Sequence, residues 1–162
     1  LHLRLLRGAQ AADATLKRTG FIHQCKKCPY REEQQGLVAH DRTCPRCGEV
    51  LHPIGPLWLG CIQDPDIIRQ MLEDACGREL GTKTDLTRLL ATCSAELPTS
   101  SFYDYHHLAK LLGCSPPHIG VVLERIRASG YPATRTHFSG YGIKTEAPLE
   151  VIFSAIKDDL DP

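Results

Sequence analysis

Apolar residues recur three and four positions apart in several stretches of the chain, the spacing that places them on one face of an α-helix. Asp64 and Asp104 stand directly before two of these stretches, where an aspartate can accept hydrogen bonds from the first N–H groups of a helix. Pro65 suits a first helical position, and Gly20 and Gly130 follow two stretches, where glycine often ends a helix. The pattern predicts helices over about residues 9–18, from Pro65 to a break at Gly81, and over 85–95, 104–112, 116–129 and 147–160.

Alternating residues predict strands near the two ends of the chain. Residues 1–8 alternate leucine with histidine or arginine, and residues 131–138 and 143–145 flank a glycine-rich hairpin tip at 139–142. The two helices that precede this hairpin are joined by a tight turn, which is the order of a helix-turn-helix followed by a wing. The last third of the chain is therefore predicted to be winged-helix-like.

Two Cys-x-x-Cys pairs, Cys25 with Cys28 and Cys44 with Cys47, are separated by fifteen residues. This spacing is typical of two zinc knuckles, in which four thiolates bind one tetrahedral ion. Four protein ligands leave no open coordination position, so the zinc is predicted to be structural, and a redox pair or surface thiols are the weaker interpretation. Three nearby histidines are interpreted as solvated loop residues: His23, His40 and His52.

The amino-acid composition indicates a cellular location for the protein but points to no binding partner. Lys plus Arg and Asp plus Glu are equal at 19 each among the 162 residues, so any binding signal must be local. No stretch approaches the roughly 20 apolar residues of a membrane helix, which excludes a membrane partner. Four further cysteines occur singly and are interpreted as small buried hydrophobes, which suggests a reducing, cytoplasmic location: Cys61, Cys76, Cys93 and Cys114.

Changes in composition divide the chain into parts. Residues 21–53 contain too few apolar residues to fold without help, and residues 54–60 are interpreted as an apolar connector. The predicted fold class is α+β, with a zinc-ribbon-like knuckle module followed by helices and a winged-helix-like C-terminal domain. The predicted parts are a strand and helix at 1–20, the zinc-knuckle module at 21–53, the connector and helices at 54–100, and the winged-helix-like domain at 101–162.

The chain is locally basic between positions 124 and 146, where no acidic residue occurs. Arg135 and His137 are two residues apart and are expected on one face of a strand, with Lys144 on the returning strand. Such a face neutralises phosphates, but an ordinary solvated hairpin with cations at a helix end explains the same residues, and both interpretations stay open. The candidate RNA-binding residues are Arg127, Tyr131, Arg135, His137 and Lys144.

The chain shows no complete catalytic site. His106 and His107 are adjacent on a predicted helix, so their side chains point about 100° apart and cannot bind one ion together. No glycine-rich loop for a nucleotide and no Gly-x-Ser-x-Gly motif is present. We therefore predict no catalytic residue in this chain.

Several segments resemble the tRNA methyltransferases that make N2,N2-dimethylguanosine, tRNA (guanine(26)-N(2))-dimethyltransferases. The resemblance covers nearly the whole chain, and its last two segments are the most specific. The segments are Arg7-Gly8-Ala9 with Ala12-Asp13, Cys25-x-x-Cys28-x-Tyr30-Arg31-Glu32, Gly55-Pro56-Leu57-Trp58-Leu59-Gly60 with Asp64-Pro65, Arg135-Thr136-His137-Phe138-Ser139, and Gly142-Ile143-Lys144-Thr145-Glu146-Ala147-Pro148.

The resemblance implies a C-terminal domain that helps to hold tRNA. In this family an N-terminal Rossmann-like domain binds S-adenosylmethionine and methylates the guanosine amine. That domain is missing from the sequence, so the resemblance gives no catalytic residue, and residues 1–20 are expected to join it. The expected partners are tRNA and this methyltransferase domain, the expected cofactor of the chain itself is structural Zn²⁺, and the resemblance implies that the four paired cysteines are its ligands.

Two alternatives from other classes remain. The first is a winged-helix DNA-binding regulator with residues 116–129 as its recognition helix. The N-terminal half of this helix is largely apolar where major-groove contacts usually lie, so DNA is not the expected partner. The second is a zinc-containing protein-interaction module.

Overall fold

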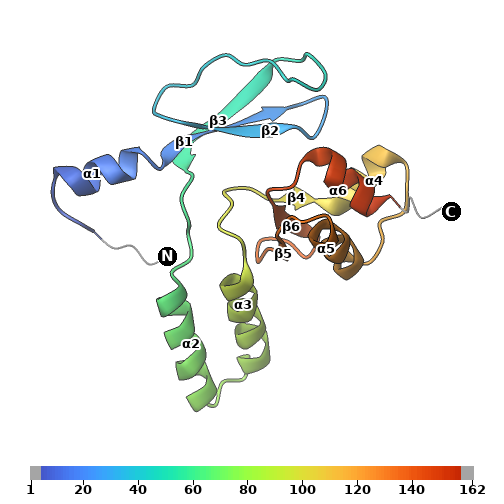
Figure 1. The fold of residues 1–162 in the computed structure, drawn as a ribbon. Helices are drawn as coiled ribbons and strands as arrows, with labels where there is room; N and C mark the ends of the chain where they lie inside the picture. Colours follow the sequence, from blue (N-terminus) through green and yellow to red (C-terminus); the bar gives the residue numbers. More distant parts are fainter. Residues whose placement is uncertain (1–4, 158–162) are drawn as a thin grey trace. The chain divides into compact units, whose positions relative to one another are not determined.

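The computed structural model describes residues 5–157, which divide after Gly60 into two compact units (Figure 1). The six helices and two small sheets of the described chain confirm the α+β class. The predicted strand at residues 1–8 lies partly outside the described residues, and residues 5–8 form no strand. No helix in the described range is long and apolar enough to span a bilayer.

The first unit combines one helix with a three-stranded antiparallel sheet. Helix α1 covers Ala9–Leu16, and strands β1 (Thr19–Cys25), β2 (Arg31–Gln35) and β3 (Leu51–Trp58) pair in the order β2-β1-β3. Strand β1 is central, and it alternates buried Phe21, His23 and Cys25 with more exposed residues. The sheet carries the side chains of the predicted knuckles at one end.

The predicted apolar connector at 54–60 is wrong, because most of it belongs to β3. Among the strands between residues 5 and 157, β3 pairs only with β1, and an edge strand tolerates Pro53 and Pro56, which cannot donate to a second neighbour. The predicted boundary between residues 53 and 54 therefore falls inside a strand. Gly20, the predicted end of the first helix, also lies in the sheet, where β1 begins at Thr19.

Gly55 permits β3 to approach β1 closely. Its φ is +152°, and a Cβ there would lie 2.6 Å from the carbonyl oxygen of Gly20 and 2.8 Å from a ring carbon of Phe21. The pairing register shifts at the same place, between Gly20 and Ile22. Only glycine combines this backbone conformation with this separation.

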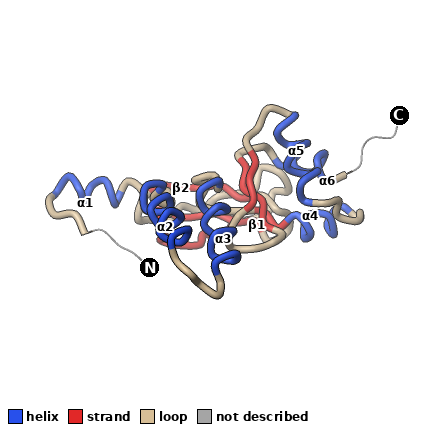
Figure 2. Tube along the Cα trace, turned by 90° about the horizontal axis from the view of Figure 1, so that it is seen from below, coloured by secondary structure: helices blue, strands red, loops and turns tan. Residues whose placement is uncertain are grey.

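The second unit begins with a helical hairpin. Helices α2 (Pro65–Gly77) and α3 (Lys83–Ala95) pack against one another, as both views show (Figures 1 and 2). The carboxylate of Asp64 accepts hydrogen bonds from the N–H groups of Asp66 and Ile67 at 3.0 and 3.2 Å, which confirms the predicted helix start.

The rest of the second unit packs three helices against a small sheet. It contains β4 (Tyr103–Asp104), α4 (Tyr105–Leu112), α5 (Ile119–Ala128), β5 (Ala133–Arg135), β6 (Gly142–Thr145) and α6 (Leu149–Ile156), and the strands pair antiparallel in the order β4-β6-β5. Leu108, Val122, Ile126, Ile143 and Ile152 are buried between them. Asp104 and Gly113 begin and end α4 as predicted.

Candidate metal centre and basic loop

Four cysteines meet at one end of the first sheet. Their Sγ atoms all lie within 4.8 Å of one another, with Cys25 and Cys47 at 3.4 Å and Cys28 and Cys44 at 3.5 Å. A tetrahedral zinc ion with Zn–S bonds of about 2.3 Å separates its sulfurs by about 3.8 Å. The four thiols therefore fit the donor set and the spacing of a structural zinc site.

The two Cys-x-x-Cys turns have the same backbone construction. The N–H of Cys25 donates to the carbonyl of Tyr30 at 3.0 Å, and the N–H of Cys44 donates to that of Glu49 at 2.8 Å, so each turn spans six residues. Gly48 has φ +73° in the second turn. A recurring turn that aims two sulfurs inward is what a knuckle requires, and local sequence was sufficient to predict it.

The sulfurs occupy unequal electrostatic environments. Burial opposes ionisation of Cys25, but the N–H groups of Cys28 and Lys27 prevail and lower its pKa to about 7. Burial raises the pKa of Cys28 to about 12, and the other three thiols contribute to the rise. One thiolate thus forms readily, while further ionisation needs a cation among the sulfurs, which a divalent metal supplies.

Polar groups next to the sulfurs stabilise the surrounding strands. The hydroxyl of Tyr30 donates to Glu32 at 2.7 Å, and Arg42 forms an ion pair with the same carboxylate at 2.9 Å. The hydrogen bond from Tyr30 and the interactions with Arg42 lower the pKa of Glu32 despite its partial burial. Arg42 also accepts the N–H of Leu51 on its carbonyl, which ties the second knuckle to β3.

The interpretation of His23 as a solvated loop residue is wrong. His23 lies in β1 and is fully buried, and its Nε2 is 2.8 Å from the side-chain oxygen of Gln34. Gln34 also accepts the N–H of His40 and donates to the carbonyl of Val38, so it stabilises the loop after β2. His40 is an exposed loop residue, as predicted, whereas His52 is exposed but lies in β3, so its predicted place in a loop is wrong.

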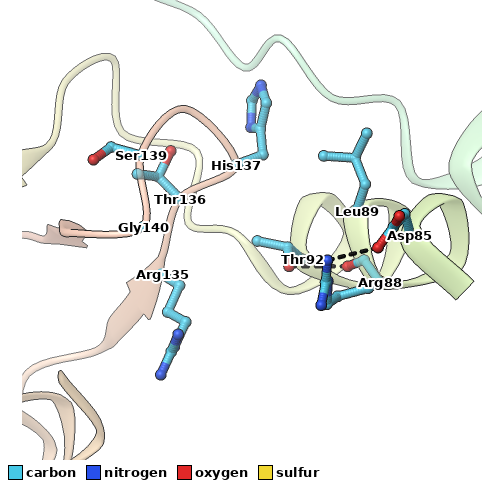
Figure 3. A pocket seen from close by; sticks show the side chains of 9 residues that line it. All are labelled: Asp85, Arg88, Leu89, Thr92, Arg135, Thr136, His137, Ser139 and Gly140. Carbon is cyan, nitrogen blue, oxygen red and sulfur yellow. Dashed lines mark hydrogen bonds and ion pairs between the residues drawn. The ribbon is translucent and has the colours of Figure 1, made fainter. Parts of the chain in front are cut away.

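The candidate RNA-binding residues do not form one surface. Arg135 is exposed and ends β5, whereas His137 lies in the loop after the strand and points in a different direction (Figure 3). The predicted common face is wrong because the strand alternation stops at Arg135. Arg127 donates to the carbonyl of Ala133 at 2.6 and 3.0 Å, and Tyr131 is half-buried.

Lys144 lies inside the second unit, so its ammonium group is not on the surface where RNA contact was predicted. Only 3% of its side chain is exposed, and its Nζ is 3.0 Å from Glu96 and 3.2 Å from the carbonyl of Leu97. All four residues of β6 are buried, and the segment with Glu96 and Leu97 covers the face of the sheet on which Lys144 lies. An alternating pattern could not foresee burial on both faces.

Glu96, which the sequence did not indicate as a site residue, connects α3 to the β5–β6 loop, residues 136–141. One carboxylate oxygen accepts the hydroxyl of Thr136 at 2.7 Å and the ammonium of Lys144, and the other accepts the backbone and ring N–H groups of His137. We call Glu96, Thr136, His137 and Lys144 the Glu96 cluster. A carboxylate directly after a helix C-terminus is unfavourable for the helix dipole, and this was its only sequence signal.

Cys93 lies near this cluster, and its sulfur, a Glu96 oxygen and a His137 nitrogen are within 4.8 Å of one another. Both oxygens of Glu96 already accept hydrogen bonds, and Lys144 neutralises its charge. Burial and the charge of Glu96 raise the pKa of Cys93, which disfavours a thiolate ligand. The cluster therefore acts as a structural clamp on the loop.

The β5–β6 loop exposes aromatic side chains next to Arg135. Phe138 and Tyr141 are 57% and 53% exposed. Phe138 stacks on Phe102 with ring centroids 6.0 Å apart, and Tyr141 lies 4.1 Å from the ring of His106. The guanidinium of Arg135 makes no hydrogen bond or ion pair with any residue between 5 and 157. The hairpin thus presents an unpaired cation at the end of β5 and two partly exposed rings on the loop that follows.

Residues 1–157 match the family described as N2,N2-dimethylguanosine tRNA methyltransferase. The chain belongs to this family. A tRNA (guanine(26)-N(2))-dimethyltransferase of Methanoregula boonei is 52% identical and matches all of the chain and 43% of its own length. Its counterpart in Methanosphaerula palustris is 49% identical over 96% of the chain and 42% of its own length.

The fold is also similar to a solved member of the dimethylguanosine methyltransferase family. The structure of Trm1 from Pyrococcus horikoshii with S-adenosyl-L-methionine is 35% identical and superposes with a TM-score of 0.77, covering 93% of this chain and 38% of that chain. The chain thus spans about two-fifths of the length of the curated relatives it matches. The predicted position at their C-terminal end stays a prediction.

Proposed function

We propose that this chain is the tRNA-binding portion of an S-adenosylmethionine-dependent tRNA guanosine N2-dimethyltransferase that forms N2,N2-dimethylguanosine. The observation that carries the proposal is the β5–β6 hairpin, in which Arg135, whose guanidinium is unpaired within residues 5–157, ends β5 and the partly exposed rings of Phe138 and Tyr141 follow on the loop. Cations bind phosphates, and exposed rings stack on unpaired bases. The methyl donor and the catalytic groups belong to the part of the enzyme outside this chain.

The proposed role is to supply affinity and orientation. A methyltransferase that acts on a base within a folded RNA must move this base out of its stack, at a cost of a few kcal/mol. Contacts to phosphates elsewhere on the tRNA offset this cost without taking part in the reaction. Arg135 is the first candidate for such a contact, while His137 and Lys144 position its loop through Glu96.

The element order of the second unit supports the proposed winged-helix-like fold. Helices α4 and α5 are followed by the β5–β6 hairpin, and β4 completes the sheet beside β6. A DNA-binding regulator would use α5 as its recognition helix. The exposed positions of α5 include Val121 and Glu124, and its Arg127 is already bonded to Ala133, so the helix offers few groups that read bases.

We also propose that Cys25, Cys28, Cys44 and Cys47 hold one structural zinc ion. The first unit has a small apolar core, in which Cys25, Cys44 and Leu51 are the buried centre of one cluster. A metal linked to four sulfurs contributes the folding free energy that such a module lacks. A cytoplasmic location, where thiols stay reduced, agrees with this role and stays a prediction.

A titration of the zinc-loaded chain with unmodified tRNA and with duplex DNA of similar length tests the proposal. We expect saturable tRNA binding that is tighter than DNA binding at every salt concentration and that weakens in Arg135→Ala. Equal weak binding to both nucleic acids, unchanged in Arg135→Ala, would refute a tRNA-binding role for this chain.

A further inference from the structure

A pocket of about 390 Å³ lies in the second unit between α3 and the β5–β6 loop (Figure 3). Helix α3 contributes Asp85, Arg88 and Thr92 to its wall, and the loop side contributes Arg135, Ser139 and Gly140. The lining therefore includes two arginines from positions 47 residues apart in sequence, of which Arg88 is directed to Asp85 and Arg135 away from the loop (Figure 3). Leu89 is its only aliphatic hydrophobic wall residue.

Several donors in this pocket have no partner or only a weak one. The guanidinium of Arg135 is unpaired within residues 5–157, and over the same range the backbone N–H groups of Ser139 and Gly140 find no acceptor. The hydroxyl of Ser139 accepts the N–H of Tyr141 and retains its own proton for donation. Free N–H groups and arginines that line one pocket suit an anion.

The one carboxylate in the wall does not cancel this charge. Asp85 pairs with Arg88 at 2.7 Å, but both side chains are more than 70% exposed, and exposed pairs of this kind contribute little. Arg88 can therefore exchange the pair for a bound anion. Glu96 lies behind Thr136 and His137, where Lys144 neutralises it, so it does not repel an anion in the pocket.

We propose that this pocket binds one backbone phosphate of the RNA, held by Arg88 and Arg135 together with the N–H groups of Ser139 and Gly140. The inference rests on the proposed tRNA-binding function and adds Arg88 on α3, which lies outside the basic segment and the hairpin. The bound group is a phosphodiester, which contacts the polar side chains and N–H groups that line the pocket. Phe138 on the same loop stays exposed and can stack on a neighbouring base.

Salt dependence of tRNA binding tests the pocket, because the logarithm of the affinity falls with the logarithm of the salt concentration in proportion to the number of phosphate contacts. We expect Arg88→Gln and Arg135→Gln each to reduce this slope by about 0.7–0.9. Since both arginines contact the same phosphate, the double variant is expected to lose about as much slope as either single variant. Arg69→Gln is the matched control, because Arg69 forms the same exposed pair with Asp66 at 2.7 Å on α2, and its slope should not change.

The outcomes separate this pocket from the general proposal. Wild-type tRNA binding with slopes unchanged in both variants would overturn the pocket and leave tRNA binding intact, and additive slope losses would indicate two phosphates and overturn the shared site. A second measurement follows the side-chain N–H signals of the arginines by NMR during titration with inorganic phosphate. Shifts at Arg88 and Arg135 but not at Arg69 would support the anion site even if the chain did not bind tRNA, and equal shifts at all three would refute it.

Discussion

Glu96→Gln removes the negative charge from the centre of the second unit and leaves the ammonium group of Lys144 without a counter-ion. The carboxylate is fully buried and the lysine side chain is 3% exposed, so water does not replace the lost partner. Removing one member of a buried ion pair typically costs about 3–5 kcal/mol of unfolding free energy. A domain of this size has about 5–15 kcal/mol in total, so the variant is expected to fold with a much smaller margin.

A double-mutant cycle with Lys144→Met separates the charge from the packing. Glu96→Gln/Lys144→Met contains neither charge, and replacement of a whole buried pair is often close to neutral. We therefore expect the double variant to be more stable than Glu96→Gln alone, which is a coupling that independent sites do not show. A double variant at least as unstable as the sum of the single variants would refute the assignment of this cluster as a charge-neutral clamp.

The assay must report the second unit alone. Amide hydrogen exchange at Ile126 and Ile143, both fully buried there, follows its opening. Trp58 is the single tryptophan and lies in β3 of the first unit, so its fluorescence is an internal control that should not change.

The same pair gives a pH dependence with a defined sign. Burial opposes ionisation of Glu96, but hydrogen bonds from His137, Thr136 and Lys144 prevail and lower its pKa below the ordinary value of 4.5. Because the pKa of Glu96 is lower in the folded state than in the unfolded state, its ionisation stabilises the fold above about pH 4.5. This stabilisation is lost as the pH falls through the pKa of the folded state. Glu96→Gln should remove this part of the acid-induced loss.

Three further substitutions test other parts of the structure. Cys28→Ser should reduce the metal content from one zinc per chain and unfold the first unit, whereas Cys114→Ser should leave the metal content unchanged, as measured by atomic absorption. Gly55→Ala should destabilise the first unit by about 1–3 kcal/mol or more through backbone strain and overlap with β1. Gly77→Ala is the control, because a Cβ at position 77 meets no atom within 4 Å, and its denaturant midpoint should not change. Arg127→Gln should lower stability by about 1–3 kcal/mol through the buried carbonyl of Ala133, with an unchanged salt slope for tRNA binding.

Local sequence predicted those features whose causes lie within a few residues. Asp64 and Asp104 start their helices through bonds to N–H groups two or three positions away, and each Cys-x-x-Cys turn spans six residues. The four cysteines could be grouped because their chemistry admits few alternatives. The signals of the helix starts are complete within a short window of sequence, which is why they were confirmed, while the zinc site stays a prediction that the clustering of the cysteines supports.

The Glu96 cluster could not be predicted because the partners of Glu96 are 40 to 48 residues away from it in sequence. A lysine in an alternating hairpin is normally exposed, and only the folded structure shows that Glu96 and Leu97 cover the face of β6 that carries Lys144. The strand β3 was missed for a related reason, since its prolines and glycine are acceptable only on an edge. In each case the pairing of distant segments overrode the local pattern.

The Glu96 cluster also links the stability of the second unit to tRNA binding, and the salt dependence of binding separates this indirect effect from a direct phosphate contact. Glu96 holds Thr136 and His137, and the loop they belong to carries the N–H groups and the serine of the proposed phosphate pocket. Glu96→Gln should therefore weaken tRNA binding by loosening the loop, yet keep the salt slope, because it removes no cation that contacts a phosphate. Arg135→Gln should change the slope while unit 2 keeps its exchange protection. If Glu96→Gln reduced the slope as Arg135→Gln does, the buried cluster would contribute directly to the phosphate contact, and its role as a clamp would be wrong.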